Sequence, residues 1–190
     1  MATTTQLLTY DDLCRMPDDG NRYELIGGEL VVSPAPTWLH QEVLVRLGEV
    51  VRPFVAAGNH GRVGIAPLDV HLGRHDIVQP DMIFVSRERV HVLTSNGTEG
   101  PPDLVVEILS PTTRRRDLGA KLVLYASAGV REYWAVEVAD PDFMLFVLKD
   151  GELVRVPHDG KTVRSVVLPG LEIDRTSLFA NLGMYRIGNR

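Results

Sequence analysis

The sequence has a single cysteine, Cys14, and no apolar run near the roughly 18 residues that a membrane-spanning helix needs. One cysteine cannot close an internal disulfide, so a disulfide scaffold is excluded and a reducing compartment is favoured. The first residues also lack the basic start and the long apolar run of a secretory signal peptide. We therefore expect a cytoplasmic protein with no membrane partner, in which Cys14 is a small buried side chain rather than a nucleophile.

Lysine is nearly as scarce, with three residues in the chain, and the formal net charge is −5. An acidic balance gives no overall attraction to nucleic acid or to anionic membranes, although it leaves room for a local basic surface. The compact basic segment is 112–131, where Arg114, Arg115 and Arg116 precede Lys121. With 44% hydrophobic and 24% charged residues, the composition excludes intrinsic disorder and is typical of one globular domain at this length.

Hydrophobic periodicity predicts helices that alternate with strands. A short helix is expected at 6–16 with Thr9 as its cap, a long one at 38–57 capped by Thr37, and another at 113–128 that ends at Gly129. Strands are expected at 22–32 (a hairpin around Gly27-Gly28), 63–72, 81–86, 104–109, 133–138, 143–148, 153–156 and 163–168, with a last short helix at 177–182. This order indicates an α/β or α+β layered domain around a mixed sheet.

Glu107 is the strongest local anomaly, because it is the one polar residue of the strand at 104–109. Such an apolar run is typical of a central strand that is covered on both faces. A carboxylate in that place must be paired, protonated or bound to a cation. A carboxylate at a strand edge that pairs with an arginine explains it about as well, and the residue alone does not decide between the two.

Asp81 begins the preceding strand, where Pro80 fixes the entry of the chain. Alone, it is explained by an aspartate that caps a turn after proline. Two acids on adjacent strands are instead the ligands that Mg²⁺ prefers, and a bound metal can activate water for attack on a phosphate. Lys121 could position that water, although an Asp117–Lys121 surface pair at four-residue spacing also explains it.

The three consecutive arginines admit a specific and a bland explanation. Arginine commonly contacts nucleic-acid phosphates, and the cluster follows the strand that carries Glu107. The explanation without a function is a solvated helix start, where positive charges would oppose the helix macrodipole. Because that position costs helix stability, we favour a ligand slightly. By contrast, His71, His75 and Asp76 form a hairpin tip that lacks a complete set of transition-metal ligands.

Several segments together resemble the Uma-type restriction endonuclease family of the PD-(D/E)XK nuclease-like superfamily. The resemblance runs from about Thr9 to Leu148, and its most specific part lies between Pro102 and Trp134. The matching positions are Tyr23-Glu24-Leu25-Ile26-Gly27-Gly28-Glu29-Leu30, His40, Pro80-Asp81, Val106-Glu107-Ile108-Leu109-Ser110-Pro111, Asp117, Lys121, Tyr125 and Gly129-Val130-Arg131-Glu132-Tyr133-Trp134.

The resemblance implies a restriction-endonuclease-like α/β/α core with a mixed central sheet and additional β hairpins. One domain would span 1–190, with its core at about 22–148, the N-terminal helix at 6–16 and a C-terminal β extension at 149–190. It also implies a homodimer, for which the hairpins between 143 and 156 offer free edges.

For the site, the resemblance implies that Asp81 and Glu107 bind Mg²⁺ or Mn²⁺. The superfamily motif has a lysine two residues after the second acid, where this chain has Leu109. Within the family the lysine is on the next helix, which points to Lys121. Further pocket residues would be Glu24 and His40, with Ser110 and Asp117 as weaker candidates that are better explained by a strand-end cap and a helix pair.

Two functions are therefore expected for different reasons. The first is a metal-dependent endonuclease that hydrolyses DNA, with Asp81, Glu107 and Lys121 as catalytic residues and the three arginines on DNA phosphates. The second is a catalytically inactive module of the same fold that binds nucleic acid or a partner protein. Leu109 and the acidic net charge favour the second.

Overall fold

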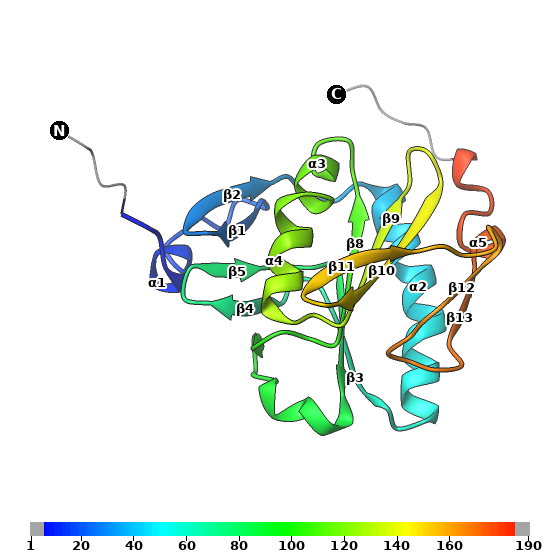
Figure 1. Ribbon diagram of the computed structural model, residues 1–190. Helices are drawn as coiled ribbons and strands as arrows, with labels where there is room; N and C mark the ends of the chain where they lie inside the picture. The colour runs from blue at the N-terminus through cyan, green and yellow to red at the C-terminus, as the bar shows by residue number, and fades with distance from the viewer. Residues whose placement is uncertain (1–5, 185–190) are drawn as a thin grey trace.

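The computed structural model describes residues 6–184, which form two large sheets and a small two-stranded one (Figure 1). The six-stranded sheet has the order β11-β10-β9-β8-β6-β3, and the five-stranded sheet has the order β2-β1-β5-β4-β7. The six strands are β3 (Gly61–Ile65), β6 (Met82–Ser86), β8 (Leu104–Leu109), β9 (Glu132–Glu137), β10 (Asp142–Lys149) and β11 (Glu152–Val156). The five are β1 (Arg22–Ile26), β2 (Glu29–Ser33), β4 (Asp69–Gly73), β5 (Asp76–Val78) and β7 (Gly97–Glu99), and the small sheet pairs β12 (Thr162–Arg164) with β13 (Glu172–Asp174).

Both large sheets are mixed, because β8 pairs with β9 and β4 with β7 in parallel while the other pairs are antiparallel. The α-helices are α1 (Tyr10–Leu13), α2 (Trp38–Ala57), α3 (Arg114–Asp117), α4 (Ala120–Ala128) and α5 (Arg175–Leu178). Short 3₁₀ turns occupy Arg87–Val92 and Leu182–Met184. No helix within residues 6–184 combines the length and the apolar character that crossing a membrane requires.

The central strand β8 separates two apolar layers, because its side chains alternate between the two faces of the sheet. Leu104, Val106 and Ile108 on one face pack in a layer with Leu47 and other residues of α2. Val105 and Leu109 on the other face pack with Tyr125 of α4. This arrangement confirms the α/β/α core with a mixed sheet and extra hairpins, and it places Glu107 on the face that α4 covers.

The long helix α2 has the bounds that its periodicity predicted. The hydroxyl oxygen of Thr37 accepts a hydrogen bond from the amide of His40 at 3.3 Å, which fixes the first turn. Val43, Leu47 and Val51 recur at four-residue intervals and are fully buried. The first turn of α2, and with it His40, is therefore held firmly against the sheet.

Two predicted elements are each divided in the structure. The strand expected at 63–72 is two strands in different sheets, with Pro67, which has no amide hydrogen, between them. The helix expected at 113–128 breaks into α3 and α4 at Gly119. A Cβ on Gly119 would lie 2.7 Å from the carbonyl oxygen of Arg115, so a larger residue would not permit this close turn.

The ends of the chain differ from expectation in smaller ways. The N-terminal helix is one short turn, in which Thr9 and Asp12 form a capping box. Cys14 is exposed rather than buried. Toward the C-terminus, Leu168 and Ile173 are buried in the layer that contains α2, so the segment after 149 completes the core. Residues 1–5 and 185–190 of the expected domain lie outside the described part.

Candidate active site

The side chain of Lys121 lies directly over Glu107. Its Nζ donates to Glu107 Oε1 at 2.8 Å and to Glu24 Oε1 at 2.7 Å, and the Tyr125 hydroxyl donates to the same Glu107 oxygen at 2.6 Å. Lys121 comes from the first turn of α4, Glu107 from β8 and Glu24 from β1. The helix thus supplies an amine on the sheet face where Leu109 lies in the apolar core.

Asp117 completes this group, which we call the inner cluster (Glu24, Glu107, Asp117, Lys121 and Tyr125). Its Oδ1 is 3.9 Å from Lys121 Nζ, so the pair expected at four-residue spacing is present but buried rather than on the surface. Every member of the inner cluster is at most 3% exposed. Burying that many charges is costly unless each is paired, so the cluster is a specific feature rather than a solvated helix face.

Asp81 lies beside the inner cluster and faces outward. Met82 pairs with Val106, and the same antiparallel register places Asp81 across from Glu107. Its Oδ1 accepts from Arg22 Nη1 at 2.9 Å, and its Oδ2 accepts from His40 Nε2 at 3.0 Å. The amide of Ile108 also donates to Oδ2, at 2.7 Å. We call Arg22, His40 and Asp81 the pocket cluster.

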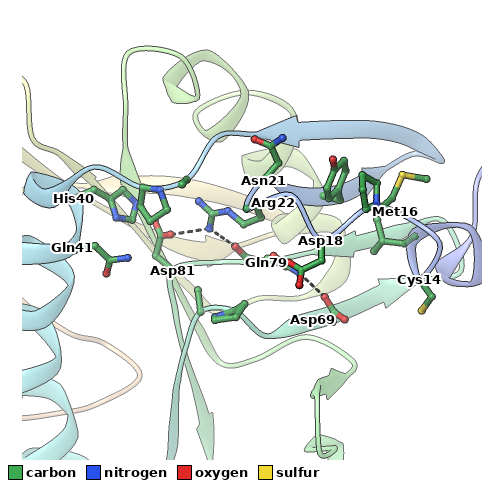
Figure 2. A pocket seen from close by; sticks show the side chains of 18 of the residues that line it. Cys14, Met16, Asp18, Asn21, Arg22, His40, Gln41, Asp69, Gln79 and Asp81 are labelled. Atoms are coloured by element: carbon green, nitrogen blue, oxygen red, sulfur yellow. Dashed lines mark hydrogen bonds and ion pairs between the residues drawn. The ribbon is translucent and has the colours of Figure 1, made fainter. Parts of the chain in front are cut away.

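A pocket of about 530 Å³ opens in front of the pocket cluster. Figure 2 shows Arg22, His40 and Asp81 close together at one side of the pocket, with Gln79 next to Arg22. Residues of α1, β1 and the start of α2 form the walls, and Cys14 is among them. The volume lies within the roughly 300–1,000 Å³ typical of ligand pockets, so a small ligand or part of a larger one would fit.

The two clusters differ in their electrostatics. Burial raises the pKa of the Glu107 carboxyl to about 8, although Lys121 acts against this shift and the charges of Asp117 and Asp81 add to it. Burial would also raise the pKa of Asp81, but the hydrogen bond from His40 and the charge of Arg22 outweigh it, and the pKa falls to about 2. Asp81 is thus a stable anion, whereas burial and the neighbouring carboxylates favour the protonated form of Glu107.

Lys121 remains an ammonium group in these surroundings. Burial disfavours its charge, but Glu107, Glu24 and Asp117 outweigh burial and raise its pKa above the usual value. A permanently protonated amine can donate hydrogen bonds and offset negative charge, but it cannot accept a proton. Lys121 is therefore suited to orient a ligand and not to act as a base.

The donor set fits a hard divalent cation. Four carboxyl groups (Glu24, Asp81, Glu107 and Asp117) lie near three basic side chains (Arg22, Arg116 and Lys121), so a fourth negative charge, which burial disfavours at Glu107, has no matching cation. Two buried oxygens, Oε2 of Glu24 and Oδ1 of Asp117, have no hydrogen-bond partner. Within residues 6–184 no group of three acidic, histidine or cysteine side chains has metal-binding geometry, so water or phosphate oxygens would have to complete the coordination shell.

The arginines of the basic segment diverge. Arg116 turns inward, where it donates to the Ser33 hydroxyl at 2.8 Å and lies 3.9 Å from Glu24. Arg114 pairs with Glu137 at 2.7 Å on the surface, and Arg115 is exposed. Ser110, at the end of β8, contacts Thr112 and Thr113 only through local hydrogen bonds, as a strand-end cap does.

Sequence reasoning missed Arg22 as a site residue. It precedes Tyr23-Glu24 in a hairpin strand, and nothing local distinguishes it from a surface arginine. Its contact with Asp81 depends on the pairing of β1 with β5, which brings it to Gln79 as well, at 2.8 Å. The available signal was its place next to Glu24, which the family resemblance includes.

Comparison with known proteins agrees with this fold and identifies a family. The structure described as "a putative nuclease belonging to DUF820" from Anabaena variabilis ATCC 29413 is similar, with a TM-score of 0.76 over 92% of this chain and 99% of that chain. The sequences are 18% identical, so this likeness shows a shared fold. No curated protein matches the chain. Residues 9–176, most of the sequence, match one family along their length, and the chain therefore belongs to the Uma2 family, described as "Putative restriction endonuclease".

Proposed function

We propose that the protein is a metal-dependent endonuclease that hydrolyses phosphodiester bonds in DNA. The observation that carries the proposal is the buried contact between Lys121 and Glu107. Glu107 lies on the strand next to Asp81, and Asp81 in turn lines an open pocket. The descriptions of the family and of the similar structure, which name an endonuclease and a nuclease, point in the same direction.

Asp81 and Glu107 would hold the Mg²⁺ or Mn²⁺ ion, with their carboxylates on neighbouring strands. When bound, such an ion polarises the phosphate and lowers the pKa of a water molecule. Lys121 would hold the water or offset charge on the phosphate as an ammonium donor. Tyr125 keeps the shared Glu107 oxygen in place through its 2.6 Å hydrogen bond.

The pocket limits what can reach these residues. A volume of about 530 Å³ admits a stretch of one DNA strand but not a duplex. The scissile phosphate would therefore have to enter the pocket as part of a single DNA strand. Outside the pocket, Arg114 and Arg115 are exposed and would contact DNA phosphates. Arg116 would not, because it is turned toward Ser33 and Glu24.

A second candidate function is a non-catalytic module that binds nucleic acid or a partner protein. It is favoured by the pocket cluster, where both oxygens of Asp81 already have partners from Arg22, His40 and Ile108. Leu109, which packs in the core, also leaves β8 without the lysine of the superfamily motif.

The deciding experiment is cleavage of supercoiled plasmid, linear duplex, single-stranded DNA and RNA with Mg²⁺, Mn²⁺ or a chelator. Asp81→Asn and Lys121→Gln keep the shape of the site, and Asp140→Asn and Lys149→Gln are matched controls at exposed positions. We expect DNA cleavage that needs metal, is lost in both site variants and persists in both controls.

Other outcomes redirect the proposal. Loss in Asp81→Asn alone would remove Lys121 from the mechanism while keeping the metal site. If the folded protein cleaves no substrate with any metal, the non-catalytic module becomes the better explanation. Cleavage of RNA in preference to DNA would contradict the proposed substrate.

We further infer that two copies of the chain associate through β11. This inference is supported by the position of β11 as an edge strand of the six-stranded sheet, with Val154 46% exposed on it. Size-exclusion chromatography with light scattering should give twice the 21.1 kDa chain mass, and Val154→Lys should halve it. A monomer mass for the unmodified chain would contradict this association.

A further inference from the structure

Arg22 occupies a place of special interest in the pocket cluster. Its Nη1 lies 2.9 Å from Asp81 Oδ1 and 2.8 Å from the carbonyl oxygen of Gln79. Its positive charge also interacts with Glu107 and Glu24 of the inner cluster. One guanidinium group therefore neutralises the carboxylate that the proposed function assigns to a metal ion.

A divalent cation and this guanidinium group cannot both be held tightly at Asp81. Two positive charges beside the same oxygen repel each other, and the repulsion is strong where little water separates them, as at a side chain 2% exposed. Arginine keeps its charge at any pH at which proteins fold, so it cannot relieve the repulsion by losing a proton. The guanidinium group has to move when a cation arrives.

Of the three basic side chains of the site, Arg22 is the one with open space beside it into which its guanidinium group can move. Lys121 is held between two carboxylates and is 1% exposed, whereas Arg116 is 21% exposed but donates to Ser33 and does not line the pocket. Arg22 is 19% exposed and lines the pocket of about 530 Å³ (Figure 2). Rotation of its long side chain would bring the guanidinium group into the space where a strand backbone would enter.

We infer that Arg22 is an exchangeable counter-cation that neutralises Asp81 before a divalent ion binds and contacts the substrate phosphate once the ion has displaced it. The planar guanidinium group has five N–H donors whose geometry matches a phosphate, which suits it to the second position. This inference rests on the proposed function, because it takes Asp81 as a metal ligand. It makes Arg22 a positioning residue whose removal affects metal and DNA in opposite directions.

The first test is Mn²⁺ binding, measured by isothermal titration calorimetry and by electron paramagnetic resonance. Arg22→Gln should bind Mn²⁺ at least tenfold more tightly than the unmodified protein, because a neutral side chain does not compete. Arg22→Lys, which keeps one positive charge and a donor, should fall between the two. Arg15→Gln removes an arginine whose side chain is 73% exposed, pairs with Asp12 and makes no contact with Asp81, so it should leave Mn²⁺ affinity unchanged.

The second test is binding of a nuclease-resistant phosphorothioate oligonucleotide in the presence of saturating Mn²⁺. Arg22→Gln should bind it several-fold more weakly than the unmodified protein, whereas Arg15→Gln should not. Circular dichroism verifies folding of each variant. If Arg22→Gln does not fold, an increase in Mn²⁺ affinity for Arg22→Lys carries the same conclusion.

The outcomes separate this inference from the proposed function. Mn²⁺ binding that is abolished by Asp81→Asn but is equal in the Arg22 variants and the unmodified protein overturns the inference and leaves the metal site intact. Mn²⁺ binding that is detected in Arg22→Gln and not in the unmodified protein supports the inference. If none of the proteins binds Mn²⁺, both the metal site and the inference are wrong.

Discussion

The two halves of the candidate site differ in how their charges are balanced. The inner cluster is sealed from water, burial raises the pKa of its Glu107 carboxyl, and one oxygen each of Glu24 and Asp117 accepts no hydrogen bond. The pocket cluster reaches the pocket and has every oxygen of Asp81 satisfied. The sealed half therefore fixes geometry, while the open half is where ions and substrate can exchange.

The largest expected effect comes from breaking the sealed half. Lys121→Met removes the cation between Glu107 and Glu24 and leaves carboxylates buried without it, which should lower the free energy of unfolding by about 3–5 kcal/mol. Urea denaturation measures the change. Lys149→Met, at the exposed end of β10, should stay within about 0.5 kcal/mol of the unmodified protein.

Adding Glu107→Gln to Lys121→Met should recover part of this loss, because one of the stranded charges disappears. An Lys121→Met protein as stable as the control would show that the inner cluster does not hold the fold together.

The next effect is a pH dependence that belongs to the sealed half. The pKa of Glu107 is raised from 4.5 to about 8, so the fold favours its protonated form. The stabilisation is complete below pH 4.5 and is lost as the pH rises through about 8, with a slope of at most about 1.4 kcal/mol per pH unit. Urea denaturation with a chelator, between pH 5 and 9, should show this slope in the unmodified protein and not in Glu107→Gln.

The matched control for that series is Glu152→Gln, which changes an exposed carboxylate on β11. It should keep the slope of the unmodified protein. Equal slopes in all three proteins would mean that Glu107 is ionised in the fold throughout this range.

A smaller change of opposite sign is expected in the open half. The pKa of Asp81 is lowered from 3.8 to about 2, so its stabilisation is present above pH 4 and is lost as the pH falls through about 2. Asp81→Asn should cost about 1–3 kcal/mol near neutral pH and flatten the acid unfolding curve. The cost stays below that of Lys121→Met because Arg22, 19% exposed, can turn toward water.

If Asp81→Asn proves as costly as Lys121→Met, the contrast between the two halves is wrong. Acid unfolding followed by tryptophan fluorescence supplies the curve, and Asp140→Asn, at an exposed position, serves as the surface comparison.

The smallest effect on stability is expected at the surface outside both clusters. Arg115→Gln should leave the free energy of unfolding within about 0.5 kcal/mol of the original. It should reduce the slope of log affinity for DNA against log salt concentration by about 1, which corresponds to the loss of one phosphate contact. Arg164→Gln, an exposed arginine paired with Glu172, is the control that should leave this dependence unchanged.

The sequence was most informative where one local signal fixes an element. The periodicity and the Thr37 cap predicted α2 at its full length, and the apolar run around Glu107 predicted a buried central strand. Lys121 was expected near Glu107 through the family resemblance, and the structure places them in contact. For α2 and β8 the information lies within a few residues of the feature, whereas the contact of Lys121 was indicated by the resemblance.

The missed features depend on contacts between distant segments. The break at Gly119 brings Lys121 over β8, and although glycine is a weak helix former, one glycine within 113–128 does not show that the chain turns there. The strand at 63–72 divides because its two parts pair in different sheets. Arg22 reaches Asp81 only because β1 pairs with β5, so its neighbours in sequence do not indicate its place in the site.

The break at Gly119 has a mechanical consequence. An amine on β8 would be held by the hydrogen bonds of the sheet, whereas Lys121 is carried by α4, a helix of nine residues that is joined to α3 by Leu118 and Gly119. The ammonium group is therefore held over Glu107 by the packing of α4 on the sheet, where Tyr125 is fully buried. A substitution that loosens this packing would move the amine with no strand displaced.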